Sequence, residues 1–126
     1  MLNKLLNSTI YVRVTQNQFR LRHIEDNREI TVSAIESFTT KRLLIGEFTT
    51  AEKYLKQGFD MIHQGKWLPA SPVVVIQPLE MIDEGLSQIE ERVLREVAAG
   101  AGARKVVVWV GQELSDQEVI SRAKGV

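Results

Sequence analysis

The residues in this sequence that could do chemistry are few and widely spaced. The chain has two histidines, His23 and His63, and no cysteine. With no second histidine nearby and no thiolate ligand, each histidine is expected to be structural or at the surface rather than a metal ligand. Glu25 and Asp26 are adjacent acids in a turn-like stretch, where carboxylates are usually solvated. The sequence therefore predicts no metal site.

Patterns for covalent catalysis and phosphate binding are also missing. No serine stands in a Gly-x-Ser-x-Gly elbow, and the chain contains neither a Walker A motif nor Gly-x-Gly-x-x-Gly. The glycine-rich stretch 100–103 follows a predicted helix, so we interpret it as a helix C-terminus and turn. The stretch 15–18 is polar but has no glycine that would let a phosphate approach the backbone. No cofactor is expected.

Composition narrows the function further. Sixteen lysines and arginines balance sixteen acids, and this zero net charge argues against a nucleic-acid partner, which needs a basic excess. The absence of cysteine fits a reducing cytoplasm. Trp67 and Trp109 are expected to pack in the core or at a sheet edge rather than to stack on bases. A chain of 126 residues is long enough for one domain.

The N-terminal residues allow two interpretations. Leu2, Leu5 and Leu6 could share one face of a short helix and touch a membrane surface weakly, or they could belong to a tail that packs on the body of the protein. No apolar run approaches the ~20 residues that span a bilayer, and no signal peptide is visible. We expect residues 1–8 to be a tail and the protein to be cytoplasmic, at the inner face of the membrane if the first interpretation holds.

The elements that would position these residues change in period along the chain. The first half alternates apolar and polar residues, which predicts three strands joined by short turns in an antiparallel meander. The second half alternates helix-period stretches with continuously apolar strands, which is typical of strands covered on both faces. The predicted elements are strands at 10–14, 19–24 and 30–35, a helix from Thr49 or Thr50 to Gly65, a strand at 73–76, a helix with an apolar stripe of Leu86, Ile89, Val93 and Val97, a strand at 106–110, and a helix capped by Ser115 or Asp116.

The resulting order is β-β-β-α-β-α-β-α, with a parallel crossover from 73 to 110. It predicts an α/β domain with a ribonuclease H-like, five-stranded mixed sheet over residues 9–126. Nucleases with this arrangement hold divalent metal with acids on the sheet. Here the first strand carries Arg13 and the two parallel strands carry no acid, so a metal-dependent nuclease is not expected.

The stretch 90–106, which reads EERVLREVAAGAGARKV, is the most specific in the chain. It resembles a segment of the bacterial actin-like rod-shape-determining family MreB, in which a Glu-Arg-Arg helix runs through Ala-Gly-Ala into an apolar strand. The stretches 71–78, 48–55 and 1–5 are similar to that family's proline-ended strand, helix start and N-terminal membrane-binding segment. The resemblance implies an actin-like fold limited to the family's first core subdomain.

The same resemblance implies a loss of ATPase machinery. The family's phosphate loop reads Asp-Leu-Gly-Thr, and the aligned residues here are Arg13, Val14, Thr15 and Gln16. The metal-linked acid and the glycine are therefore absent. Glu90 falls at the family's water-orienting position, and we interpret it as a relic on a helix surface. The family's second half-cleft has no counterpart in this sequence, so we expect no enzyme activity.

These implications favour a non-catalytic interaction module, linked to the cell-shape apparatus, that binds a protein partner or a second copy of itself. The alternative is a residual nucleotide-binding, ATPase-like protein that completes its cleft through a partner or a dimer. The surface that would face the missing half-cleft is the candidate interaction surface, and an apolar patch there would favour the first hypothesis. Its predicted members are Thr15, Gln16, Asn17, Gln18, Glu80, Met81 and Ile82.

Overall fold

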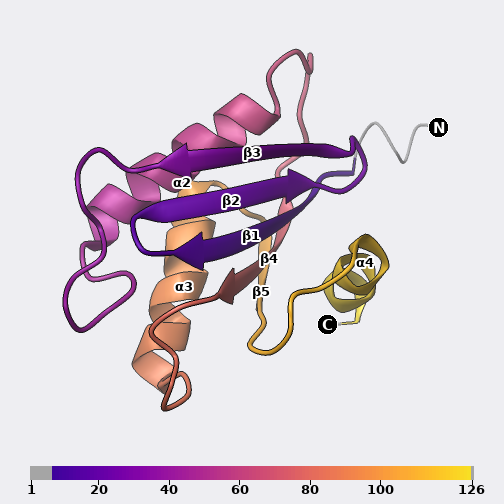
Figure 1. Cartoon of the computed structure of the whole chain (residues 1–126). Coiled ribbons are helices and arrows are strands. Elements are labelled where there is room, and N and C mark those ends of the chain that lie inside the picture. Colours follow the sequence, from indigo (N-terminus) through magenta and orange to yellow (C-terminus); the bar gives the residue numbers. More distant parts are fainter. Residues whose placement is uncertain (1–6, 126) are drawn as a thin grey trace.

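The structure is a computed structural model that describes residues 7–125. Over this range the elements follow the predicted order β-β-β-α-β-α-β-α (Figure 1). They are β1 (Thr9–Thr15), β2 (Gln18–His23), β3 (Arg28–Ser33), α2 (Phe48–Ile62), β4 (Val73–Pro78), α3 (Gln88–Ala101), β5 (Lys105–Val108) and α4 (Asp116–Lys124).

The strands form one mixed sheet in the order β3-β2-β1-β4-β5. β1, β2 and β3 pair antiparallel as the predicted meander, and β4 pairs parallel with both β1 and β5. The tight β1–β2 turn places Asn17 at a φ of 57°, a left-handed conformation that asparagine tolerates better than most residues. An α/β domain with a five-stranded mixed sheet is therefore confirmed.

Helices cover the two faces of the sheet unequally. α2 and α3 pack on one face, and α4 lies against the other face beside β4 and β1 (Figure 1). The larger core, under α2 and α3, includes Val12, Leu55 and Val97, and a smaller cluster under α4 includes Tyr11 and Val119. Because successive side chains of a strand point to opposite faces, β1 contributes to both clusters.

The buried face of α3 differs from the predicted stripe. Leu86 lies before the helix begins, and the Ile89 side chain is 76% exposed. The residues that α3 buries are Leu94, Val97, Ala98 and Ala101, spaced three, one and three apart as one helical face requires. The first turn of α3 extends beyond the core, and this leaves an isoleucine at the surface.

Three further predictions concern the positions where helices and strands begin or end. α2 starts at Phe48 with Glu47 as N-cap, so capping by Thr49 or Thr50 is wrong. Ser115 caps α4 by accepting the backbone amide of Glu118, as predicted. β5 ends at Val108, two residues before the predicted end at 110, and its residues are half-buried because it forms an edge of the sheet.

The two tryptophans lie in different surroundings. Trp67 is 92% exposed on the connection between α2 and β4, so its predicted packing role is wrong. Trp109 packs against the cluster under α4, and the Arg122 guanidinium lies 3.7 Å from its ring centroid. The packing prediction therefore holds for Trp109 alone.

Candidate interaction surface

The polar groups of the turn between β1 and β2 form hydrogen bonds with other residues of the protein. The backbone amide of Gln16 donates to a carboxylate oxygen of Glu80 at 2.7 Å, and the amide of Asn17 donates to Thr39 Oγ1 at 2.9 Å. The side-chain oxygen of Asn17 accepts the backbone amides of Phe38 and Thr39, both at 2.9 Å. Phosphate sites form where several backbone amides converge on one anion. Here the carboxylate of Glu80 already accepts one of the turn amides, that of Gln16.

The other residues that the resemblance aligns with a phosphate loop have different surroundings. Arg13 is buried on the sheet face that Tyr11 shares with α4, and its guanidinium lies 3.4 Å from Glu29 and 3.6 Å from Glu113. Val14 is part of the larger core. The arginine that the resemblance aligns with the family's acid therefore lies between two carboxylates.

Glu80 brings the two predicted segments of the surface together. The backbone amide of Leu79 donates to the carbonyl of Val14 at 2.9 Å, which extends the pairing of β1 with β4. Glu80 then reaches back to Gln16, and Met81 turns the chain with a φ of 60°. The stretches 15–18 and 80–82 thus lie side by side, as the predicted surface requires.

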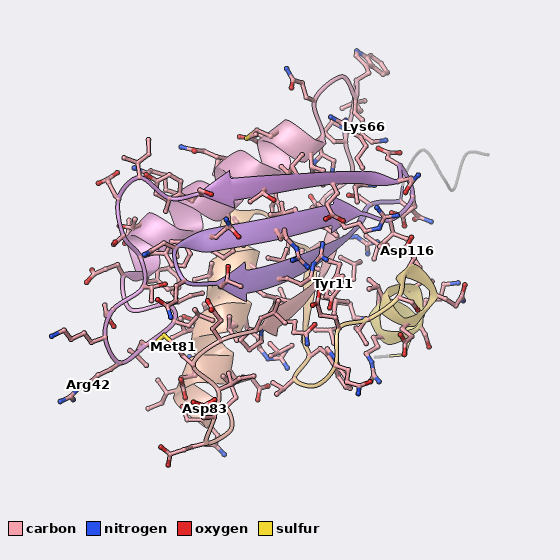
Figure 2. The ribbon with its side chains drawn as sticks, viewed as in Figure 1. Tyr11, Arg42, Lys66, Met81, Asp83 and Asp116 are labelled. Carbon is pink, nitrogen blue, oxygen red and sulfur yellow. The ribbon has the colours of Figure 1, made fainter. Side chains whose placement is uncertain are left out.

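An open apolar groove lies next to this junction, between the loop before α2, the β4–α3 connection and α3 itself. In Figure 2, Met81, Arg42 and Asp83 all lie at this end of the molecule. Ile89 is 76% exposed and Leu43 is 40% exposed, so part of the lining stands free in solvent. Apart from Glu90 the lining is apolar: Leu43, Leu44, Ile45, Pro78, Met81, Ile82, Leu86, Ile89, Val93 and Leu94.

Glu90 occupies the third position of α3 and takes part in a capping box. Its carboxylate accepts the backbone amide of Ser87 at 3.0 Å, and Ser87 Oγ accepts the backbone amide of Glu90 at 3.1 Å. This arrangement satisfies two amides that a helix start otherwise leaves unpaired. The geometry gives Glu90 a role in starting α3, and its interpretation as a relic of catalysis stays a prediction.

One wall of the groove has no counterpart among the predicted residues. Leu43, Leu44 and Ile45 form it, from the segment between β3 and α2. The signal that could have revealed this wall is the run of three aliphatic residues after Lys41 and Arg42. Ile89 was assigned to the core because the helical period cannot show where a helix extends beyond its sheet.

The histidines are not isolated from each other, contrary to expectation. The rings of His23 and His63 lie edge to face with centroids 5.4 Å apart, and both approach the hydroxyl of Ser8. Within residues 7–125, no group of three or more histidine, aspartate or glutamate side chains could hold a metal ion. The two rings meet because the end of β2 lies next to the end of α2. The wide separation of these residues along the chain gives no sign of this contact.

The adjacent acids Glu25 and Asp26 have protein partners instead of being simply solvated. Glu25 accepts the backbone amide of Thr9 at 2.8 Å and its hydroxyl at 2.7 Å. Asp26 pairs with the ammonium group of Lys66 at 3.0 Å. Both carboxylates therefore tie the β2–β3 turn to neighbouring segments.

The possible membrane contact of Leu2, Leu5 and Leu6 lies outside the described residues, so both interpretations of the N-terminal segment stay predictions. Within the described part of the chain, the helices are too short or too polar to cross a bilayer.

No protein-family model matches the sequence. The chain is similar to "Uncharacterized protein YjaA" of Escherichia coli, with 41% identity over 103 residues that cover 78% of this chain and 80% of that protein. It is also similar to the cell shape-determining protein MreB of Haemophilus influenzae and of Escherichia coli, with 35% identity over 63 residues in each case. These 63 residues are 50% of this chain and 17% of MreB, which indicates a distant MreB-like relationship over half the chain.

Proposed function

The chain belongs to the family of the Escherichia coli protein YjaA, and from this premise we propose that it is a non-catalytic protein-interaction module derived from an MreB-like ancestor. The strand order 3-2-1-4-5, with an antiparallel meander followed by two parallel strands, supports a ribonuclease H-like, actin-like subdomain. The similarity to the cell shape-determining protein MreB supports a link to the cell-shape apparatus.

The observation that carries the proposal is the apolar groove beside the β1–β2 turn. Ile89 and Leu43 present exposed aliphatic surface there, and the partly buried Met81 lines the groove beside them. Burying apolar surface favours association, and contiguous exposed apolar patches mark interaction sites on soluble proteins. The occupant is a protein: an MreB filament or a second copy of the chain.

A substitution at Ile89 tests this proposal. We expect Ile89→Glu to weaken association roughly tenfold or more, because it places a charge in the apolar contact. Ile35 is the matched control, since it is 95% exposed and lies outside the groove lining, so Ile35→Glu should leave association unchanged. The measurements are co-sedimentation with assembled MreB filaments and sedimentation velocity of the chain alone. The proposal fails if the unmodified chain associates with neither, or if both variants behave like it.

The nucleotide-binding alternative has its own test. Glu80 already accepts the Gln16 amide, and Arg13 pairs with carboxylates, so we expect no saturable response to ATP with Mg²⁺. Tryptophan fluorescence and thermal shift are the two readouts, with Glu80→Ala as the variant that frees the amide. A saturable, Mg²⁺-dependent response of the unmodified chain would establish the alternative instead.

A further inference from the structure

A sealed polar cluster lies at the end of the sheet opposite the groove. Ser8, on the approach to β1, places its hydroxyl oxygen 3.1 Å from His23 Nε2 and 2.8 Å from His63 Nε2. His23 is the last residue of β2 and His63 follows the last residue of α2. All three side chains are buried. The cluster therefore joins three segments that are distant in sequence.

The hydrogen bonds of the cluster define where its protons lie. The backbone amide of Asp26 donates to His23 Nδ1 at 3.2 Å, so this nitrogen is an acceptor and His23 carries its proton on Nε2. His23 Nε2 then donates to the Ser8 oxygen, and the Ser8 hydroxyl donates to His63 Nε2. His63 Nε2 must be unprotonated to accept it. The arrangement is complete only when both imidazoles are neutral.

The charged groups around the cluster come from three segments. Glu25 and Asp26, in the β2–β3 turn, place carboxylate oxygens 3.7 Å from His23 Nδ1. Lys66, from the α2–β4 connection, pairs with Asp26 at 3.0 Å, and Arg28 at the start of β3 donates to the Gln64 carbonyl at 2.9 Å. The acids favour a protonated His23, and the two cations oppose it.

Burial outweighs the nearby acids for both rings. Desolvation lowers the pKa of His23, with the carboxylates of Asp26 and Glu25 acting in the opposite direction. Desolvation also lowers the pKa of His63, and the neighbouring His23 and Lys66 add to this, against Asp26 and the hydrogen bond with Phe59. The direction agrees with the neutral state that the hydrogen bonds require.

We propose that the Ser8–His23–His63 cluster is an acid-sensitive latch, which fixes the chain entering β1 to the end of α2 and opens in mildly acidic conditions. A proton on His63 Nε2 removes the acceptor of the Ser8 hydroxyl, so two N–H groups then face one oxygen. Two imidazolium rings would also repel each other across an edge-to-face contact of 5.4 Å. The segments that open are residues 7–8 and the connection at 63–72, which carries the exposed Trp67.

The pH window follows from the direction of these shifts. The unfolded chain binds protons on histidine near pH 6.5, and the folded chain binds them only at lower pH. The stability that the latch contributes is therefore present above about pH 6.5 and is lost as the pH falls through the folded pKa values. Acids titrate well below this window, and the chain has only these two histidines. Proton uptake on unfolding between pH 7 and 5.5 should therefore come from the cluster.

The test compares urea unfolding midpoints at pH 7 and pH 5.5 for the full chain and two variants. The unmodified chain should show a lower midpoint at pH 5.5. The double variant His23→Gln, His63→Gln should show the same midpoint at both values. Ser8→Ala should raise the pKa of His63, because the neutral ring loses the hydrogen bond that the Ser8 hydroxyl donates to it. Hydrogen exchange, corrected for intrinsic pH effects, should rise more at pH 5.5 in residues 63–72 than in the middle of β4.

A proton NMR titration of the unmodified chain keeps the proposal testable if the double variant does not fold. We expect both imidazole Cε1–H signals to titrate below pH 6.5. The latch is overturned if either ring titrates at or above that value, if the pH dependence persists in a folded double variant, or if exchange in residues 63–72 does not respond to pH.

Discussion

The two ends of the sheet are built in opposite ways. Where β1 and β4 end, Met81 and Ile89 line an open apolar groove, and at the other end His23 and His63 share one buried hydroxyl. Figure 2 shows Lys66, which pairs with Asp26 beside the histidines, far from Met81. An open apolar surface can gain free energy by binding a partner, whereas a sealed polar cluster can respond to protons. The fold thus places the proposed association and the proposed pH response on separate residues.

The largest effect is expected where the groove and the core share a side chain. Leu94 is buried in the larger core and also lines the groove floor, so Leu94→Ala should lower the free energy of unfolding by about 2–5 kcal/mol. Ile89→Ala, at the exposed rim, should change it by less than about 0.5 kcal/mol. Urea unfolding of both variants measures the difference. Equal costs at the two positions would show that the groove floor is not continuous with the core.

A smaller loss of unfolding free energy is expected at two glutamates, which lie at opposite ends of the sheet and each accept a backbone amide. Glu25 is mostly buried and accepts both the amide and the hydroxyl of Thr9, so Glu25→Ala should cost about 1–3 kcal/mol of unfolding free energy. Glu80 makes its contact with Gln16 at an exposed turn, where water replaces the lost acceptor. Glu80→Ala should therefore cost less than about 1 kcal/mol.

Thermal or urea unfolding at pH 7 compares these two variants directly. The comparison reports the environment of each hydrogen bond. A larger loss for Glu80→Ala than for Glu25→Ala would contradict the picture of one sealed end and one open end.

The element order could be predicted from the sequence because each element carries its own period. The continuously apolar stretch at 73–76 predicted a strand covered on both faces, and all of β4 is buried. The capping pattern at Ser115 predicted the start of α4 for a local reason, the reach of its hydroxyl to Glu118. Such features depend on residues a few positions apart, which the sequence displays.

The site could be predicted only in part, because its geometry depends on where elements end relative to one another. The stretch 80–82 was assigned to the surface, and Met81 and Ile82 do line the groove. Leu43 was missed because it lies in a loop, where apolar residues do not recur at the regular spacing of a helix or strand. The contact of His23 with His63 was missed because it needs the register of β2 and the length of α2 together.

The smallest expected effect concerns a partly exposed ion pair between Arg22, the residue before His23 on β2, and Asp116 at the start of α4. The two guanidinium–carboxylate contacts measure 2.7 and 2.8 Å, and the Arg22 guanidinium lowers the pKa of Asp116. A lowered carboxyl pKa contributes stability that is present above the unfolded value of about 3.9 and is lost as the pH falls through the folded value. Since Asp116 is half exposed, solvent screening keeps the contribution below about 1 kcal/mol.

Asp116→Asn should therefore leave a small deficit in unfolding free energy at pH 7 that disappears as the pH falls below 4. Urea midpoints from pH 5 to pH 2.5, at low and high salt, measure this deficit, and Asp83→Asn at the exposed groove end is the matched control. High salt should shrink the deficit because the pair is partly solvated. The midpoints that test the histidine cluster are compared between pH 7 and pH 5.5, above the range measured here. If Asp116→Asn altered the slope between pH 7 and 5.5, the pH response in that range would not belong to the histidine cluster alone.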